Sequence, residues 1–154
     1  MVQRVRFRLD DAATAELAAL RGRVAERGIG IPKDVPAVTV AAATQLTGSA
    51  RAALVAELAT PALPSIWLAT LGTVAGRPAE LVLAAVVDAE LLAVHAAVHD
   101  ALAGRVKGPV AAYLPGAWLP HCVLATDHPA AAFAVLHPVT PIRARVTAVD
   151  ADAP

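Results

Sequence analysis

Two segments near opposite ends of the chain alternate between apolar residues and arginines, and this pattern most constrains the fold. The first covers residues 2–9, where three apolar residues alternate with three arginines: Val5, Phe7 and Leu9 with Arg4, Arg6 and Arg8. The second covers residues 142–149 and repeats the scheme: Ile142, Ala144 and Val146 with Arg143, Arg145 and Thr147. Because successive side chains of a strand point to opposite faces, each segment predicts a strand with one buried face and one charged face.

The arginine face has two interpretations. If it lines a cleft, the guanidinium groups can hold phosphate in a bidentate manner. Alternatively, the arginines form a solvated sheet face, or charged edge strands that prevent aggregation.

Between these two strands, hydrophobic periodicity predicts four helices and four more strands. The helices begin at caps provided by Asp10 and Asp11, Ser49, Asp88, and Asp127 with Pro129. The strands cover residues 37–44, 66–74, 81–87 and 118–126, and the middle two form a β-hairpin around Gly76. The order β-α-β-α-β-β-α-β-α-β predicts one α+β domain over residues 1–150, followed by a disordered tail at 151–154.

Composition excludes several classes of protein. The formal net charge is zero, whereas proteins that bind long nucleic acids usually carry a basic excess, so we expect no long nucleic acid as a partner. The longest charge-free stretches, 58–76 and 108–126, contain prolines that oppose a membrane-spanning helix. A single cysteine, Cys122, excludes an internal disulfide and is typical of a reducing compartment. With no apolar signal segment in the first residues, we expect a cytoplasmic protein and no membrane partner.

Two strand starts that lie 84 residues apart are built alike. Residues 35–41 (Val-Pro-Ala-Val-Thr-Val-Ala) and 119–125 (Leu-Pro-His-Cys-Val-Leu-Ala) share the scheme apolar, Pro, X, apolar, X, apolar, Ala. The repeat indicates an internal duplication, although an alanine-rich chain also produces such matches by chance.

These segments, together with residues 6–11, the helix that carries His95 and His99, and the run Tyr113 to Ala125, resemble the two-histidine (2H) phosphoesterase superfamily. The similar branch contains 2′-5′ RNA ligase-like proteins and RNA cyclic phosphodiesterases. Its mark is a pair of H-x-[ST] tripeptides on two strands. The resemblance implies two pseudo-symmetric lobes, each a small, mainly antiparallel sheet flanked by helices, around a central cleft. It also implies a nucleotide or RNA-end cyclic phosphate as ligand, no cofactor and no metal; we expect a monomer.

The sequence departs from the family pattern at two of its four motif positions. Ala37 stands where the first histidine belongs, while Thr39 keeps the hydroxyl; His121 keeps the second imidazole, while Val123 replaces the second hydroxyl residue. In the family, one histidine acts as base and the other as acid. Since a positioned acid or base contributes roughly 10² to 10⁴ in rate, the loss predicts weak or absent catalysis. One alternative is an active enzyme with His121 as general acid and a substitute base; another is an interaction protein with a filled cleft.

The remaining candidate residues each have a plainer interpretation. His121 and Thr39 are predicted catalytic-site residues, or else scaffold. Tyr113 and Trp118 can stack a nucleobase or can be ordinary aromatic packing. His95 and His99 have the i, i+4 spacing of a metal pair, but no third ligand is apparent, so a buried, hydrogen-bonded histidine is favoured. Cys122 must face away from His121, as a buried inert thiol.

Overall fold

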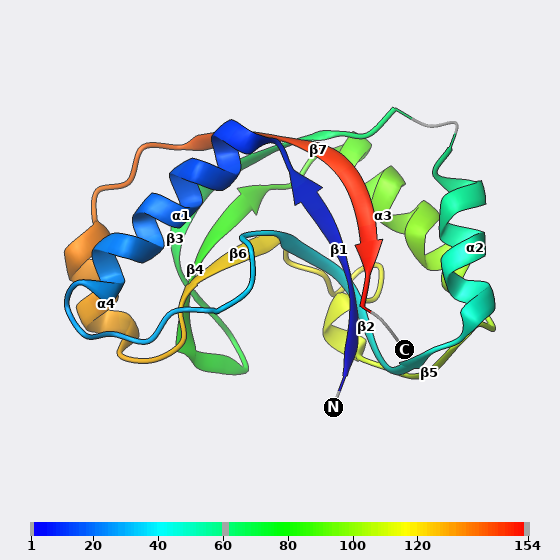
Figure 1. Ribbon diagram of the computed structural model, residues 1–154, viewed down its shortest axis with the longest axis horizontal. Helices are drawn as coiled ribbons and strands as arrows, with labels where there is room; N and C mark the ends of the chain where they lie inside the picture. The colour runs from blue at the N-terminus through cyan, green and yellow to red at the C-terminus, as the bar shows by residue number, and fades with distance from the viewer. Residues whose placement is uncertain (1, 60–61, 153–154) are drawn as a thin grey trace.

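The computed structural model describes residues 2–59 and 62–152, which form an α+β fold (Figure 1). The elements in chain order are β1 (Gln3–Leu9), α1 (Asp11–Ala25), β2 (Val38–Leu46), α2 (Gly48–Glu57), β3 (Ser65–Val74), β4 (Arg77–Val86), α3 (Ala89–Leu102), β5 (Val106–Pro109), the 3₁₀ helix η1 (Ala111–Tyr113), β6 (His121–Ala125), α4 (Pro129–Leu136) and β7 (Ile142–Ala151).

The seven strands form one antiparallel sheet in the order β5-β2-β1-β7-β3-β4-β6. The two terminal strands predicted from the alternation, β1 and β7, are neighbours near its middle. The sheet arches strongly, as Figure 1 shows, and the curvature brings β2 and β6 into contact although they share no ladder. The two strand starts that look alike in the sequence therefore meet in space.

The helices pack on the sheet in two pairs, one at each end of the arch in Figure 1. Helices α1 and α4 contact each other and the β7-β3-β4-β6 side, whereas α2 and α3 contact each other and α3 packs on β2. The apolar faces of the strands supply the core, where Val5, Phe7 and Leu68 are fully buried. The arginines of β1 lie on the opposite face, because side chains alternate along a strand.

Three predicted boundaries are confirmed. Asp10 and Asp88 cap α1 and α3 by accepting hydrogen bonds from the backbone N–H groups of Ala13 and Leu91. The predicted hairpin is the β3–β4 pair, with Gly76 at a positive φ of 89° in its turn. Such a φ favours glycine, which has no Cβ.

Other predicted boundaries are wrong. Helix α2 begins at Gly48 with Thr47 as its N-cap, so Ser49 lies inside the helix. Helix α4 begins at Pro129 as predicted, but its N-cap is His128 in a left-handed conformation, and the Asp127 carboxylate instead accepts a hydrogen bond from Gly30 N–H at 2.9 Å.

The loop predicted after α3 contains β5 and η1, two elements too short to show periodicity. The strand predicted from residue 118 starts only at His121.

The predicted end of the domain at residue 150 is too early. Strand β7 continues to Ala151, and Asp152 N–H donates a hydrogen bond to the Arg4 carbonyl at 2.9 Å. The rest of the predicted tail, residues 153 and 154, lies outside the described residues.

No helix in the described ranges combines the length and apolar character needed to cross a membrane.

Candidate functional site

A cavity of about 370 Å³ lies where β1, β2, β4 and β6 converge on the arginine side of the sheet. All four motif positions line it: Ala37, Thr39, His121 and Val123. The imidazole from one predicted motif and the hydroxyl from the other thus face one hollow, 82 residues apart in the sequence.

Strand alternation explains how both motifs reach the cavity. In β2, Val38 and Val40 are fully buried on the helix side, so Thr39 between them faces the cavity. In β6, Cys122 and Leu124 are buried in the same way between the cavity-facing positions. Burial raises the pKa of the Cys122 thiol to about 11, which agrees with the predicted inert cysteine.

The surrounding ladder fixes the neighbours of each motif residue. Thr39 is paired with Arg6 across the β1–β2 ladder, and His121 is paired with Ala84 across the β4–β6 ladder. Paired residues share a face of the sheet, so Arg6 lies beside the hydroxyl group at the cavity.

One ring nitrogen of His121 forms a hydrogen bond, and the other has no partner among the described residues. Its Nδ1 lies 2.7 Å from the Leu119 carbonyl oxygen, which can only accept, so Nδ1 carries the proton. Burial lowers the pKa of His121 below the ordinary 6.5, an effect that Arg77 reinforces, while the Leu119 hydrogen bond and Glu80 oppose it. The ring is therefore mainly neutral at pH 7, and Nε2 presents a lone pair.

Cationic side chains dominate the rest of the wall. Of the lining residues, five are Arg or Lys (Arg4, Arg6, Arg21, Lys33 and Arg77), whereas two are Asp or Glu (Asp34 and Glu80). The chain as a whole is neutral, so this excess of positive charge is local to the cavity.

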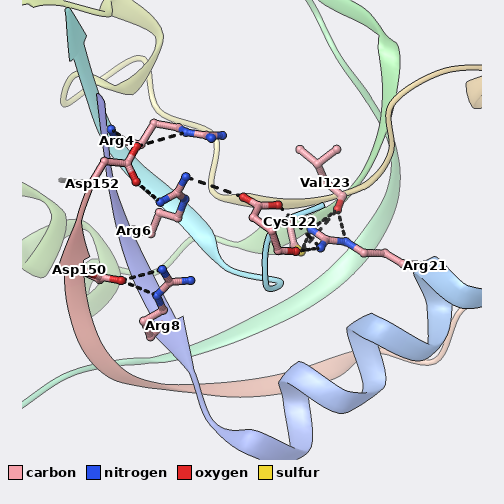
Figure 2. A network of polar contacts seen from close by, with 9 residues as sticks. Arg4, Arg6, Arg8, Arg21, Cys122, Val123, Asp150 and Asp152 are labelled. Carbon is pink, nitrogen blue, oxygen red and sulfur yellow. Dashed lines mark hydrogen bonds and ion pairs between the residues drawn. The ribbon is translucent and has the colours of Figure 1, made fainter. Parts of the chain in front are cut away.

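Two arginines of the first strand, Arg4 and Arg6, line the cavity. The Arg6 Nη1 donates to Asp152 Oδ1 at 2.5 Å, and its Nη2 lies 3.8 Å from Asp34 Oδ2. The side chain is 92% buried, and Figure 2 shows its contact with Asp152. Arg4 approaches the same Asp152 carboxylate at 3.9 Å and stays 43% exposed. Arg4 is thus the cation of the pair that is free to meet a ligand.

The other arginines of the predicted set lie outside the cavity. Arg8 is paired with Asp150 at 2.6 Å, as Figure 2 shows. Arg143 lies over the Trp67 ring, with its Cζ 4.7 Å from the ring centroid. Arg145 is exposed, and its backbone N–H donates to Asp10 Oδ1 at 2.6 Å. For these three residues the prediction of a place in the cleft is wrong, because the cavity lies toward the other end of β1.

The predicted place of Trp118 at the cavity is also wrong. It does not line the cavity: it is 8% exposed, stacks on His95 with centroids 3.9 Å apart, and donates its indole N–H to the Thr39 carbonyl at 3.0 Å. His95 Nε2 in turn lies 3.0 Å from the Val40 carbonyl. Trp118 therefore positions β2 from behind and offers no face to a nucleobase.

Tyr113 does line the cavity. It is 9% exposed, and its hydroxyl accepts a hydrogen bond from Arg77 Nη1 at 3.0 Å. Arg77 is also ion-paired with Glu80 at 2.9 Å, so the turn of the β3–β4 hairpin is tied to the cavity wall. A second cavity of about 540 Å³ shares Arg4, Arg77, Tyr113 and His121 with the first.

Arg21, which is not among the residues predicted from the sequence, organises the β6 side of the cavity. The Arg21 Nε and Nη2 groups donate to the Val123 carbonyl at 3.0 and 2.8 Å, and Nη1 donates to the Asp34 carbonyl at 2.7 Å (Figure 2). A signal was available: Arg21 follows Leu17 by four residues and precedes Val24 by three, so it falls inside the apolar stripe of α1. Lys33, Asp34, Arg77 and Glu80 come from a loop and a hairpin end, and no periodicity marks them.

His95 and His99 are hydrogen-bonded histidines, as favoured above; both Nε2 atoms lie within 3.0 Å of the Val40 carbonyl. Burial, and then the neighbouring His99, lower the pKa of His95 to about 4. Within residues 2–59 and 62–152, no three or more His, Cys, Asp or Glu residues gather as metal ligands.

Comparison of the chain with models of protein families and with curated proteins finds no match.

Proposed function

We propose that this cavity binds the phosphate of a nucleotide or of an RNA end, including a 2′,3′-cyclic phosphate, with catalysis weak or lost. One observation carries the proposal: an imidazole with a free Nε2, a hydroxyl and exposed cations line one hollow, and they come from the two motifs that resemble the 2H phosphoesterase tripeptides. The resemblance in sequence and this arrangement support a two-lobed 2H fold as part of the same proposal.

Electrostatics supports an anionic ligand. The five cations of the wall outnumber its two carboxylates, and Asp152 is already shared by Arg4 and Arg6. Charge-assisted hydrogen bonds from arginine to phosphate are about twice as strong as neutral ones. A singly charged phosphodiester that meets Arg4, Arg77 and Lys33 therefore gains more than it loses to the carboxylates nearby.

Weak catalysis follows from Ala37. A methyl group at this position cannot transfer a proton, and His121 is the only imidazole on the described wall of the cavity. His121 is mainly neutral at pH 7, which suits a base or a hydrogen-bond acceptor better than the general acid of the alternative hypothesis. The other alternative, a filled cleft, fits poorly with a hollow of about 370 Å³ beside His121.

Calorimetric titration with a 2′,3′-cyclic nucleotide tests the proposal. We expect millimolar or tighter binding that weakens about tenfold in His121→Ala and a few-fold in Thr39→Val. The phosphodiester keeps one charge between about pH 5 and 8, so tighter binding at the lower pH indicates that His121 takes up a proton from solution when the anion binds. His128→Ala is the matched control, since His128 is exposed on the α4 cap and outside the cavity. No binding at millimolar concentration, or equal binding by His121→Ala, would contradict the proposal.

A further inference from the structure

Trp67 is an exposed aromatic residue that the proposed phosphate site does not use. The chain has two tryptophans, and while Trp118 is buried, Trp67 on β3 is 46% exposed. Its partner across the β3–β4 ladder, Val86, is 56% exposed, so the two side chains form a contiguous exposed apolar patch of the kind that indicates a binding surface.

The register places Trp67 on the same face of the sheet as His121. Trp67 is paired with Val86 of β4, and His121 is paired with Ala84 of the same strand. Residues 84 and 86 point to one face because they are two apart. Val86 is 56% exposed, so this face is open to solvent beside Trp67.

The spacing sets the size of the ligand. Strand β4 separates the strands of Trp67 and His121, and their partners on β4 are two residues apart. From the spacing of strands and the rise per residue, the two Cα atoms lie roughly 12 Å apart along the sheet. This spacing favours a ligand longer than one nucleotide. We therefore assign a base on Trp67 to the nucleotide that precedes the one with the terminal phosphate.

A cationic side chain lies beside the exposed Trp67 ring. Arg143 lies over one face of the Trp67 ring at 4.7 Å, and its guanidinium forms no ion pair with the residues that the structure describes. A cation beside an aromatic platform is the combination that holds single-stranded nucleic acids, with the ring under a base and the cation near the linking phosphate.

We infer that Trp67 and Arg143 form a second subsite that stacks the penultimate base of a short single-stranded RNA end. The inference rests on the proposed function and narrows the preferred ligand from a mononucleotide to an oligonucleotide of at least two residues. The competing explanation is a cross-strand pair that only stabilises the β3–β7 ladder.

The test compares a ribonucleoside 2′,3′-cyclic phosphate with a diribonucleotide ending in the same group, in wild type, Trp67→Ala and Trp67→Phe. We expect the dinucleotide to bind roughly tenfold more tightly to wild type, this gain to be lost in Trp67→Ala and largely retained in Trp67→Phe, and mononucleotide affinity to be unchanged. Dinucleotide binding should also quench the tryptophan fluorescence of wild type, and this quenching should be absent in Trp67→Ala.

The control is Phe133→Ala, which removes another partly exposed ring, 36% exposed on α4, and should leave both affinities unchanged. The inference is overturned, while the phosphate site stands, if wild type binds the two ligands with equal affinity. It is also overturned if Trp67→Ala loses affinity for both ligands equally while its melting temperature is unchanged. Binding of neither ligand to wild type overturns both.

Discussion

The two strand starts that meet at the cavity share a scaffold and differ in chemistry. In β2 the residues behind the motif, Val38 and Val40, are as fully buried as Cys122 and Leu124 behind the motif of β6. The cavity side differs: Ala37, just before β2, and Thr39 present a methyl group and a hydroxyl, whereas β6 presents an imidazole and an isopropyl group. Packing on the helix side thus fixes the position of each strand, and the cavity side can change without disturbing it.

The supports behind the strands also differ. Arg21 from α1 holds β6 through the Val123 carbonyl, while Trp118 and His95 hold β2 through the Thr39 and Val40 carbonyls. One side depends on a permanent cation and the other on a neutral histidine. The two halves of the site should therefore respond differently to mutation and to pH.

The largest expected effect is on the β6 side. Arg21→Met should reduce the free energy of unfolding by about 4 kcal/mol, because it removes three charge-assisted, part-buried hydrogen bonds to the carbonyls of Val123 and Asp34. Urea denaturation measures the change. Arg23→Met is the matched control on the same helix: Arg23 donates to the Val135 carbonyl from an exposed position, so its loss should cost less than about 1 kcal/mol. Equal costs for the two variants would contradict the assigned role of Arg21.

The next effect is a pH dependence on the β2 side. His95 has its folded-state pKa lowered to about 4, so the unfolded chain takes up the proton first as the pH falls below 6.5. The free energy of unfolding should therefore fall by about 3 kcal/mol between pH 6.5 and pH 4, and this contribution is fully present above pH 6.5. Denaturation series for wild type and His95→Gln isolate it, since the other titrating groups are common to both. Identical slopes would show that His95 is not the group concerned.

The third prediction restores the chemistry that β2 has lost. Ala37→His places a second imidazole at the cavity, and we expect hydrolysis of a 2′,3′-cyclic nucleotide to rise by roughly 10². The gain should disappear in the double variant Ala37→His, His121→Ala. If binding is intact but the rate does not rise, β2 does not present its residue 37 toward the same phosphate as His121.

The sequence predicts what depends on local periodicity. The alternation of Val5, Phe7 and Leu9 with the arginines identifies β1 and its two faces, and Asp10 and Asp88 identify two helix starts. The motif positions could be predicted because residues i and i+2 of a strand share a face. These features need no knowledge of distant contacts.

The rest depends on tertiary contacts that no local pattern records. Arg143 has the same alternation as Arg6, yet the position of its strand relative to the cavity decides that only Arg6 reaches it. Trp118 and Tyr113 look equivalent in sequence, but the stacked His95 buries the first behind β2 while the hydroxyl of the second meets Arg77 at the cavity.

The most direct test of the account is a crystal structure of the protein with a bound 2′,3′-cyclic nucleotide. We predict the phosphate within hydrogen-bond distance of His121 Nε2 and the Thr39 hydroxyl, with Arg4 or Arg77 on its other oxygens. A phosphate bound elsewhere on the molecule, or a nucleotide whose phosphate touches neither motif, would contradict the claim that the two strands form one phosphate site.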